Sequence, residues 1–132
     1  MRLLVIFVLS MQLFASDFNS NDGAPIRQGV HIEWYRTIAP GYNGEGIFVW
    51  SDTRFGMRNI FAHKIDQDGN LLWGDNGAVI TNLPGRQEDP VAITDGAGGA
   101  FIAWVDYRFD AQGDIFLQHV NNNGCLLYTS PS

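Results

Sequence analysis

Residues 46–55 read GIFVWSDTRF, and residues 100–109 read AFIAWVDYRF. The two stretches align with Trp50 on Trp104, an offset of 104 − 50 = 54 residues. Each is an apolar stretch that ends in the pattern Trp-x-Asp-x-Arg-Phe. A match of this kind indicates an internal repeat, and a repeat decides the fold class before any single element does.

The similarity resumes after a turn. Residues 59–65 (NIFAHKI) align with residues 114–120 (DIFLQHV) at an offset of 114 − 59 = 55, and Gly69 then aligns with Gly124. One residue inserted in a surface turn accounts for the changed offset, because turns tolerate insertion. The repeat therefore extends over an apolar stretch, a turn, a second apolar stretch and a second turn.

Short apolar stretches alternate with glycine-containing turns in each repeat. Residues 90–94 (PVAIT) and 101–104 (FIAW) predict strands, and the second is apolar on both faces, as expected of a strand buried between two layers. Residues 95–99 (DGAGG) predict the turn between them, since glycine readily adopts positive φ. With further strands at 114–120 and 78–81, the pattern predicts an all-β fold of β-propeller-like blades, each of about four antiparallel strands.

The repeat divides the chain into five segments. We expect a signal peptide at residues 1–16, a lead-in and partial first blade at 17–45, repeat unit 1 at 46–99, a truncated repeat unit 2 at 100–124, and a separate tail at 125–132. Propellers close with typically 4–8 blades. About two blades leave apolar faces uncovered, so the sequence predicts an incomplete, fragmentary propeller.

The N-terminal segment predicts export. Arg2 precedes the apolar run 3–9 (LLVIFVL), and small residues follow at Ala15 and Ser16, which is the pattern of a signal peptide. The run is shorter than the roughly 20 residues that span a bilayer. We expect a secreted, periplasmic or cell-surface protein without a membrane span in the mature chain. The alternative is a buried first strand or helix.

The C-terminal residues 125–132 (CLLYTSPS) resemble the translated peptide of a common sequencing adapter. This resemblance implies that the repeat sequence stops near Gly124. The alternative is a natural ending, because residues 126–128 (LLY) align with residues 71–73 (LLW).

Composition excludes several classes of function. The chain has 8 Lys and Arg against 14 Asp and Glu, a net charge of −6, which argues against a nucleic-acid partner. Its single cysteine excludes an internal disulfide and any multi-cysteine metal site. The three histidines show no zinc spacing, and no nucleophile-elbow motif is present, so we expect no cofactor, no metal and no catalytic residue in these units.

The most suggestive polar feature is the repeated Trp-x-Asp-x-Arg pattern. Its arginine could bind carboxylates or glycans, and its tryptophan could stack on sugars. We favour a structural role because the pattern recurs, with the aspartate capping the turn, the arginine pairing with an acid of the neighbouring blade, and the tryptophan packing between blades. The candidate residues are Trp50, Asp52, Arg54, Trp104, Asp106 and Arg108.

The repeat resembles propeller-type repeats in exported proteins of environmental bacteria. The resemblance is carried by residues 49–54 (VWSDTR), 59–62 (NIFA) and 68–73 (DGNLLW), and by 98–108 (GGAFIAWVDYR) and 113–116 (GDIF) in the second copy. It implies a non-catalytic surface or secreted scaffold that offers a binding face for glycans or proteins, with the ligand left open. The alternative is an exported glycoside hydrolase or lyase whose catalytic residues lie in other blades.

Overall fold

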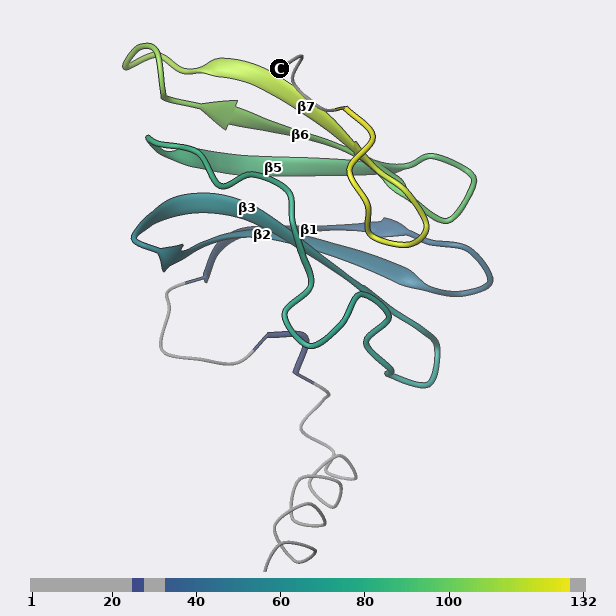
Figure 1. The fold of residues 1–132 in the computed structure, drawn as a ribbon. Helices are drawn as coiled ribbons and strands as arrows, with labels where there is room; N and C mark the ends of the chain where they lie inside the picture. Colours follow the sequence, from purple (N-terminus) through teal and green to yellow (C-terminus); the bar gives the residue numbers. More distant parts are fainter. Residues whose placement is uncertain (1–24, 28–32, 129–132) are drawn as a thin grey trace, which may run out of the picture.

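The structure, a computed structural model, describes residues 25–27 and 33–128. In these residues the chain is all-β, as predicted, with two antiparallel sheets and no helix (Figure 1). It therefore contains no helix that could span a membrane within the described ranges. The predicted signal peptide at 1–16 lies outside them. The first sheet has the order β1 (Glu33–Pro40), β2 (Gly46–Phe55), β3 (Met57–Ile65), β4 (Ala78–Val79), and the second the order β5 (Gln87–Thr94), β6 (Ala100–Asp106), β7 (Asp114–Val120).

The two sheets repeat one another strand by strand. β1, β2 and β3 pair in the order and direction of β5, β6 and β7. The first strand of each sheet even carries a bulge at the same repeat position, where Tyr35 has φ 41° and Asp89 has φ 52°. Such positive φ values are uncommon outside glycine. The bulge is therefore part of the structural repeat, although the dissimilar residues Tyr35 and Asp89 do not indicate it in the sequence.

The sheets begin earlier than the sequence units. Residues 33–40, which the sequence placed in a lead-in and partial blade, form β1, the edge strand of the sheet that also contains β2. In the same way β5 belongs with β6, although it lies at the end of the unit 46–99. The sequence boundaries at 46 and 100 thus fall between the first and second strands of each sheet.

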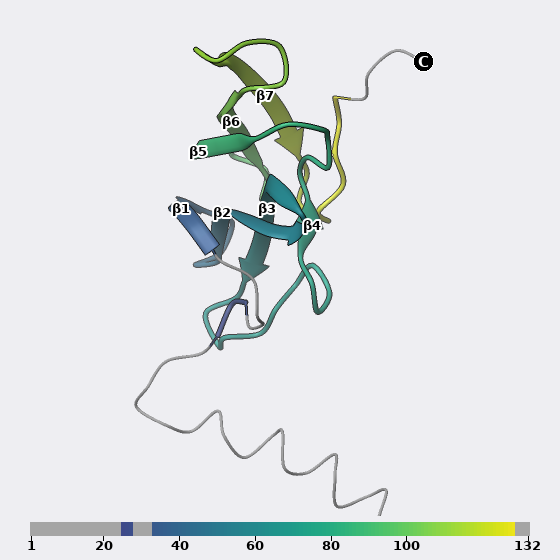
Figure 2. The same ribbon diagram turned by 90° about the vertical axis from the view of Figure 1, so that its left-hand side faces the viewer.

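The two sheets lie against each other, as the edge-on view of Figure 2 shows, and the buried side chains show that unlike faces meet. Side chains alternate between the two faces of a strand, so each sheet has two separate surfaces. The contact face of the first sheet comprises the buried residues Ile47, Val49, Ile60 and Ala62. It packs on the opposite surface of the second sheet, formed by Ala100, Ile102, Trp104 and Val120.

The second sheet leaves its other surface uncovered in the structure. This open face carries Val91, Ile93, Ile115 and Leu117, whose exposed fractions are 62%, 65%, 75% and 51%. By the repeat offsets, Ile115 and Leu117 correspond to Ile60 and Ala62 of the first sheet, which are fully buried. The open face is therefore the counterpart of the contact face, with nothing packed on it among the described residues.

A polar turn follows the third strand of each sheet. The Asp66 carboxylate accepts the backbone N–H groups of Asp68 and Asn70 at 2.9 and 2.8 Å. The Asn121 side chain accepts those of Asn123 and Cys125 at 2.9 and 3.0 Å. The turns thus have the same geometry with either side chain.

The chain beyond the second turn also follows the first unit. Leu126 bridges Val120 as Leu71 bridges Ile65. The described part of the tail, residues 125–128, therefore continues in the register that the first unit shows at residues 70–73.

Candidate functional site

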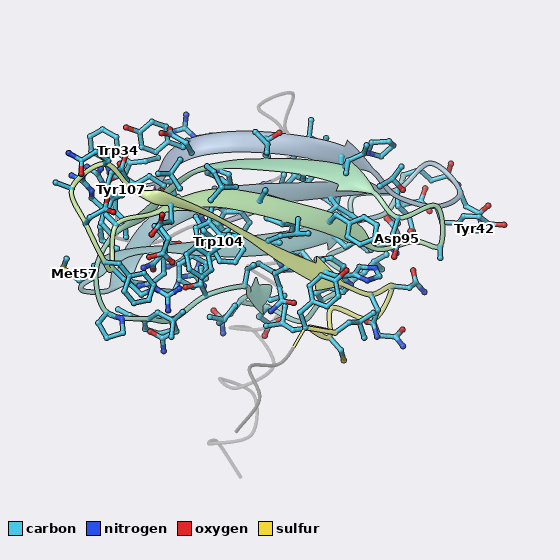
Figure 3. The ribbon with its side chains drawn as sticks, turned by 90° about the horizontal axis from the view of Figure 1, so that it is seen from above. Trp34, Tyr42, Met57, Asp95, Trp104 and Tyr107 are labelled. Atoms are coloured by element: carbon cyan, nitrogen blue, oxygen red, sulfur yellow. The ribbon has the colours of Figure 1, made fainter. Side chains whose placement is uncertain are left out.

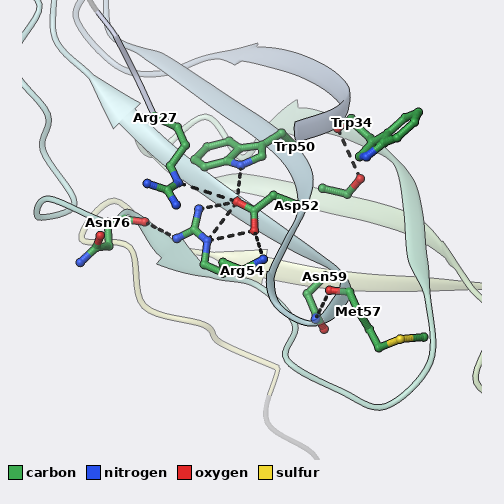
Figure 4. A network of polar contacts seen from close by, with 9 residues as sticks. Arg27, Trp34, Trp50, Asp52, Arg54, Met57, Asn59 and Asn76 are labelled. Carbon is green, nitrogen blue, oxygen red and sulfur yellow. Dashed lines mark hydrogen bonds and ion pairs between the residues drawn. The ribbon is translucent and has the colours of Figure 1, made fainter. Parts of the chain in front are cut away.

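The first Trp-x-Asp-x-Arg pattern closes into a compact cluster at the end of β2 (Figure 4). Trp50 and Asp52 lie on one face because they are two residues apart in the strand. The indole Nε1 of Trp50 donates to Asp52 Oδ2 at 2.9 Å. A register shift after Asp52 turns the chain back, so that Arg54 Nε reaches both carboxylate oxygens at 3.0 Å and its Nη2 reaches Oδ2 at 2.6 Å.

The second copy forms the same cluster at the end of β6. Trp104 Nε1 donates to Asp106 Oδ2 at 3.2 Å, and Arg108 Nε reaches the two carboxylate oxygens at 2.8 and 2.9 Å. In both copies the aspartate Oδ1 also accepts the arginine backbone N–H, at 3.0 Å. The tryptophan, aspartate and arginine of each sequence pattern are therefore in contact within their own copy.

Each arginine also lies over an aromatic ring of the third strand. The guanidinium carbon of Arg54 is 3.7 Å from the centre of the Phe61 ring. That of Arg108 is 4.6 Å from the centre of Phe116. A cation above an aromatic face is attracted by the ring quadrupole. The arginine therefore ties the turn after the second strand to the third strand.

The arginine partner differs from the expected one. We predicted a pair with an acid of the neighbouring blade, whereas Arg54 and Arg108 each bind the aspartate two residues earlier in their own motif. In both copies the aspartate Oδ1 accepts the backbone N–H of the arginine, and this bond holds the arginine beside the aspartate of its own motif. Asp52 also has Arg27 nearby, with Nε at 3.9 Å from Oδ2.

Both aspartates are fully buried and ionised. Burial alone would raise the pKa of Asp52, but the hydrogen bonds from the Arg54 side chain and backbone and from Trp50 hold it below its usual value. Opposing effects from burial, Arg108 and Trp104 likewise leave the pKa of Asp106 lowered. A general acid needs a raised pKa. These carboxylates suit a fixed anion that organises donors, and not a proton donor.

The two tryptophans occupy different surroundings. Trp104 belongs to the core between the sheets, where the expected packing role applies. Trp50 lies on the surface of the first sheet that faces away from the second, and it borders a cavity of ≈ 310 Å³. Arg27, Glu33 and Arg36 also line this cavity. Trp50 is nevertheless only 4% exposed, so its ring offers little area for stacking on a ligand.

Lys64 is a buried site that the sequence reasoning missed. Its side chain is 1% exposed, and its ammonium donates to Gly98 O at 2.9 Å and to Asn122 Oδ1, both in the second sheet's turns. It also pairs with Glu45 at 2.6 Å. The available signal was a lysine within the otherwise apolar run of β3. A charge at such a position is retained only when its donors are satisfied.

The equivalent position in the second sheet holds His119, which pairs with Asp95 at 2.8 Å. Asp95 lies in the turn between β5 and β6, which Figure 3 places at the same end of the strands as Tyr42. Burial raises the pKa of Asp95, but hydrogen bonds from His119 and from the backbone of Ala97 and Gly99 lower it further than burial raises it. This pair therefore lies within the second sheet, whereas the contacts of Lys64 reach from one sheet to the other.

The remaining candidates for chemistry are engaged or dispersed. Glu88, one of two adjacent acids that could contribute to a glycosidase pair, binds Arg58 and Arg86. His63 is buried on β3, and His31 lies outside the described residues. Within residues 25–27 and 33–128, no three His, Cys, Asp or Glu side chains gather to hold a metal ion.

No family model matches the chain, and no curated protein or solved structure shows significant similarity to it. The function is therefore inferred from the geometry of the chain itself.

Proposed function

We propose that the chain is part of an exported, β-propeller-like repeat protein and acts as a non-catalytic scaffold whose sheets stack in series. The observation that carries this proposal is the packing of unlike faces. The contact face of the first sheet is buried by the second sheet, and the second sheet presents the matching open face outward. A further sheet of the same kind could cover that face through the same type of contact.

The exposed apolar side chains of the open face support the proposed stacking of sheets. Val91, Ile93, Ile115 and Leu117 are each more than half exposed. A shallow hollow on this face is lined by three of them, Val91, Ile93 and Leu117, together with Ala92, Phe101 and Ala103. Contiguous apolar patches on soluble proteins mark interaction sites. Isolated surface leucines would need no such explanation, but here the counterparts of Ile93, Ile115 and Leu117 in the first sheet are buried.

The clusters at Asp52 and Asp106 support a scaffold over an enzyme. Each carboxylate is held by an indole, a guanidinium and a backbone N–H. These contacts occur in both copies and fix the turn that follows the second strand. A group bound in this way stabilises a fold, whereas a catalytic carboxylate must be free to exchange a proton or contact substrate.

Self-association of the purified chain tests the stacking. We expect the apparent mass from light scattering to rise with concentration, because the open face of one copy can be covered by another. Replacing Ile93→Lys together with Leu117→Lys should keep the chain monomeric. Tyr42→Lys, at a turn residue that is 58% exposed, is the matched control and should behave as the unmodified chain. A chain that stays monomeric and binds no hydrophobic dye would overturn the proposal.

Two further measurements test the other parts. Reducing-sugar assays on a panel of polysaccharides should show no product, and reproducible release that survives repurification would favour the glycosidase alternative. Expression in a bacterial host should yield a chain shortened at its N-terminus near residue 16 and recovered outside the cytoplasm. Retention of the full-length chain in the cytoplasm would contradict export.

A further inference from the structure

Three reactive side chains meet where the two sheets are in contact. Lys64 on β3 directs its ammonium at the carboxylate of Glu45, with Nζ 2.6 Å from Oε2. The same nitrogen donates to the side-chain oxygen of Asn122, which belongs to the turn after β7. An amine, a carboxylate and a carboxamide are therefore in direct contact, and the amine and the amide come from different sheets.

The surroundings hold the amine against the amide. Lys64 is 1% exposed, and its Nζ also donates to Gly98 O at 2.9 Å, so the nitrogen is bound by three partners. The amide carbon Cγ of Asn122 is one covalent bond beyond the oxygen that Nζ contacts. Reaction between two groups is strongly favoured when they are held at about 3–3.5 Å in a productive orientation. Asn122 itself is exposed, so a small leaving group can pass from this amide into solvent.

The three residues depart from the repeat together. The repeat offsets place a different residue at each equivalent position of the other copy, namely His119 for Lys64, Gly99 for Glu45 and Gln67 for Asn122. A requirement of the fold alone is met in both copies, as it is in the Trp-x-Asp-x-Arg clusters. Three departures that meet at one point indicate a role that is confined to this contact.

We propose that Lys64 and Asn122 form an isopeptide bond, catalysed by Glu45, which joins the two sheets covalently. The nucleophile is the neutral amine, so the Glu45 carboxylate first accepts a proton from Nζ. Nζ then attacks Cγ of Asn122, and the Nζ–Cγ bond forms as the Cγ–Nδ2 bond breaks. Nζ gives up two protons in all. Both pass through Glu45 to Nδ2, which leaves as ammonium and restores the carboxylate.

The bond keeps the two sheets together when the chain unfolds. The joined residues are 58 positions apart. A cross-link over a loop of this kind restricts the unfolded chain, as a disulfide does. The product retains one N–H on Nζ, so the hydrogen bond to Gly98 O can survive the reaction. Because both sheets belong to one chain, the bond requires no stacking of further sheets.

Trypsin digestion of the purified full chain, followed by tandem mass spectrometry, tests the bond. We expect a branched peptide that joins residues 59–86 to residues 109–132, with no cleavage after Lys64 and a mass lower than the sum by one ammonia. Loss of ammonia within a linear peptide can arise at an asparagine–glycine pair and is not the bond. Linear peptides alone, from a chain whose folding is confirmed by circular dichroism, would overturn the proposal.

Substitution of the two joined residues tests their assignment. Lys64→Met and Asn122→Ala should each yield linear peptides only. Asn123→Ala alters the next side chain of the same turn and is the matched control, which should retain the branched peptide. A branched peptide that persists in Asn122→Ala, or that is lost in a folded Asn123→Ala chain, would refute this pair.

Glu45→Gln tests the catalytic carboxylate, because it keeps a polar group of similar size beside Nζ and removes the base. Bond formation is followed by the amount of branched peptide at intervals after cell-free synthesis. The rate should fall by about 10²–10⁴-fold, the usual contribution of a positioned base. A purely structural role for Glu45 would lower the melting temperature and leave this rate unchanged, which would overturn its assignment. Should a variant fail to fold, the branched peptide of the unmodified chain still decides.

Discussion

Replacing Arg54 with methionine should destabilise the chain strongly, through the carboxylate it leaves behind. Arg54→Met keeps an unbranched apolar side chain over Phe61 and removes the guanidinium from Asp52. The aspartate is 0% exposed, and it would keep the Trp50 indole, one backbone N–H and the more distant Arg27 Nε at 3.9 Å. The methionine side chain is flexible and should fit this position without steric strain. The effect therefore reports on the charge.

The size of the effect follows from the contacts. Removing one partner of a buried ion pair costs about 3–5 kcal/mol when the other charge stays uncompensated. Because Arg27 remains 3.9 Å from Asp52 Oδ2, we expect the lower end of that range. Arg108→Met removes the equivalent contacts of Asp106 and should cost about 1 kcal/mol less, since no bond to a carbonyl such as that of Asn76 is lost. The double variant Asp52→Asn with Arg54→Met should recover about 2 kcal/mol of the loss, a coupling expected for residues in direct contact.

Urea unfolding followed by tryptophan fluorescence and by far-ultraviolet circular dichroism measures these differences. The free energies of unfolding are compared between variants whose dependence on urea concentration (the m-value) is the same, because a changed m-value indicates a change in the unfolded ensemble. A value for Arg54→Met within about 0.5 kcal/mol of the unmodified chain, which is typical of neutral surface changes, would refute the structural role of the cluster. The same conclusion would follow if the double variant lost as much stability as the two single substitutions added together.

Three more perturbations test the geometry around the two sheets. Gly77→Ala should destabilise the chain by more than about 2 kcal/mol, because the new Cβ would meet Ala62 O at 2.4 Å. Gly96→Ala is the control, since Gly96 also has positive φ but open space around it, and should cost only about 1 kcal/mol. Thermal melts of the two variants measure the difference. Lys64→Met should cost about 2 kcal/mol in urea unfolding, since the buried Gly98 O loses its donor, and an unchanged midpoint would refute a stabilising role of Lys64 between the sheets. Asp95 has a lowered pKa, so the folded chain binds fewer protons than the unfolded chain near pH 4. The Asp95 carboxylate contributes fully to stability above its pKa in the unfolded chain, about 3.9, and this contribution is lost as pH falls through its pKa in the folded chain. Melting temperatures between pH 6 and 3 should therefore fall less steeply in Asp95→Asn. Parallel curves for the two chains would contradict this.

Much of the architecture can be predicted from the repeat. The alternation of apolar stretches and glycine-containing turns is a local property, so strands such as 114–120 and the turn at 95–99 can be recognised without knowledge of their partners. The Trp-x-Asp-x-Arg clusters are also short in sequence. Their members lie within five residues of one another, and the strand period places tryptophan and aspartate on one face.

The features that escaped prediction depend on contacts between distant segments. The bulges at Tyr35 and Asp89 share a position and no side-chain chemistry, so nothing in the residues announces them. The partners of Lys64 come from turns 34 and 58 residues away. The arginine partner was misassigned although the contact is local, because the turn in which the aspartate Oδ1 accepts the N–H of the arginine two residues on was not considered.

The ammonium of Lys64 determines more than the strength of the contact between the sheets. Apolar packing has no preferred direction, so the contact face alone would hold the sheets together over a range of angles. Two acceptors of the second sheet, Gly98 O and Asn122 Oδ1, restrict one corner of the interface, while Glu45 of the first sheet holds the ammonium in place. In a series of such sheets, the rotation from each to the next decides whether the series closes into a ring and after how many members. In the proposed series, position 64 would set this rotation only where it holds a lysine, because the second sheet has His119 there, bound to Asp95 of its own sheet.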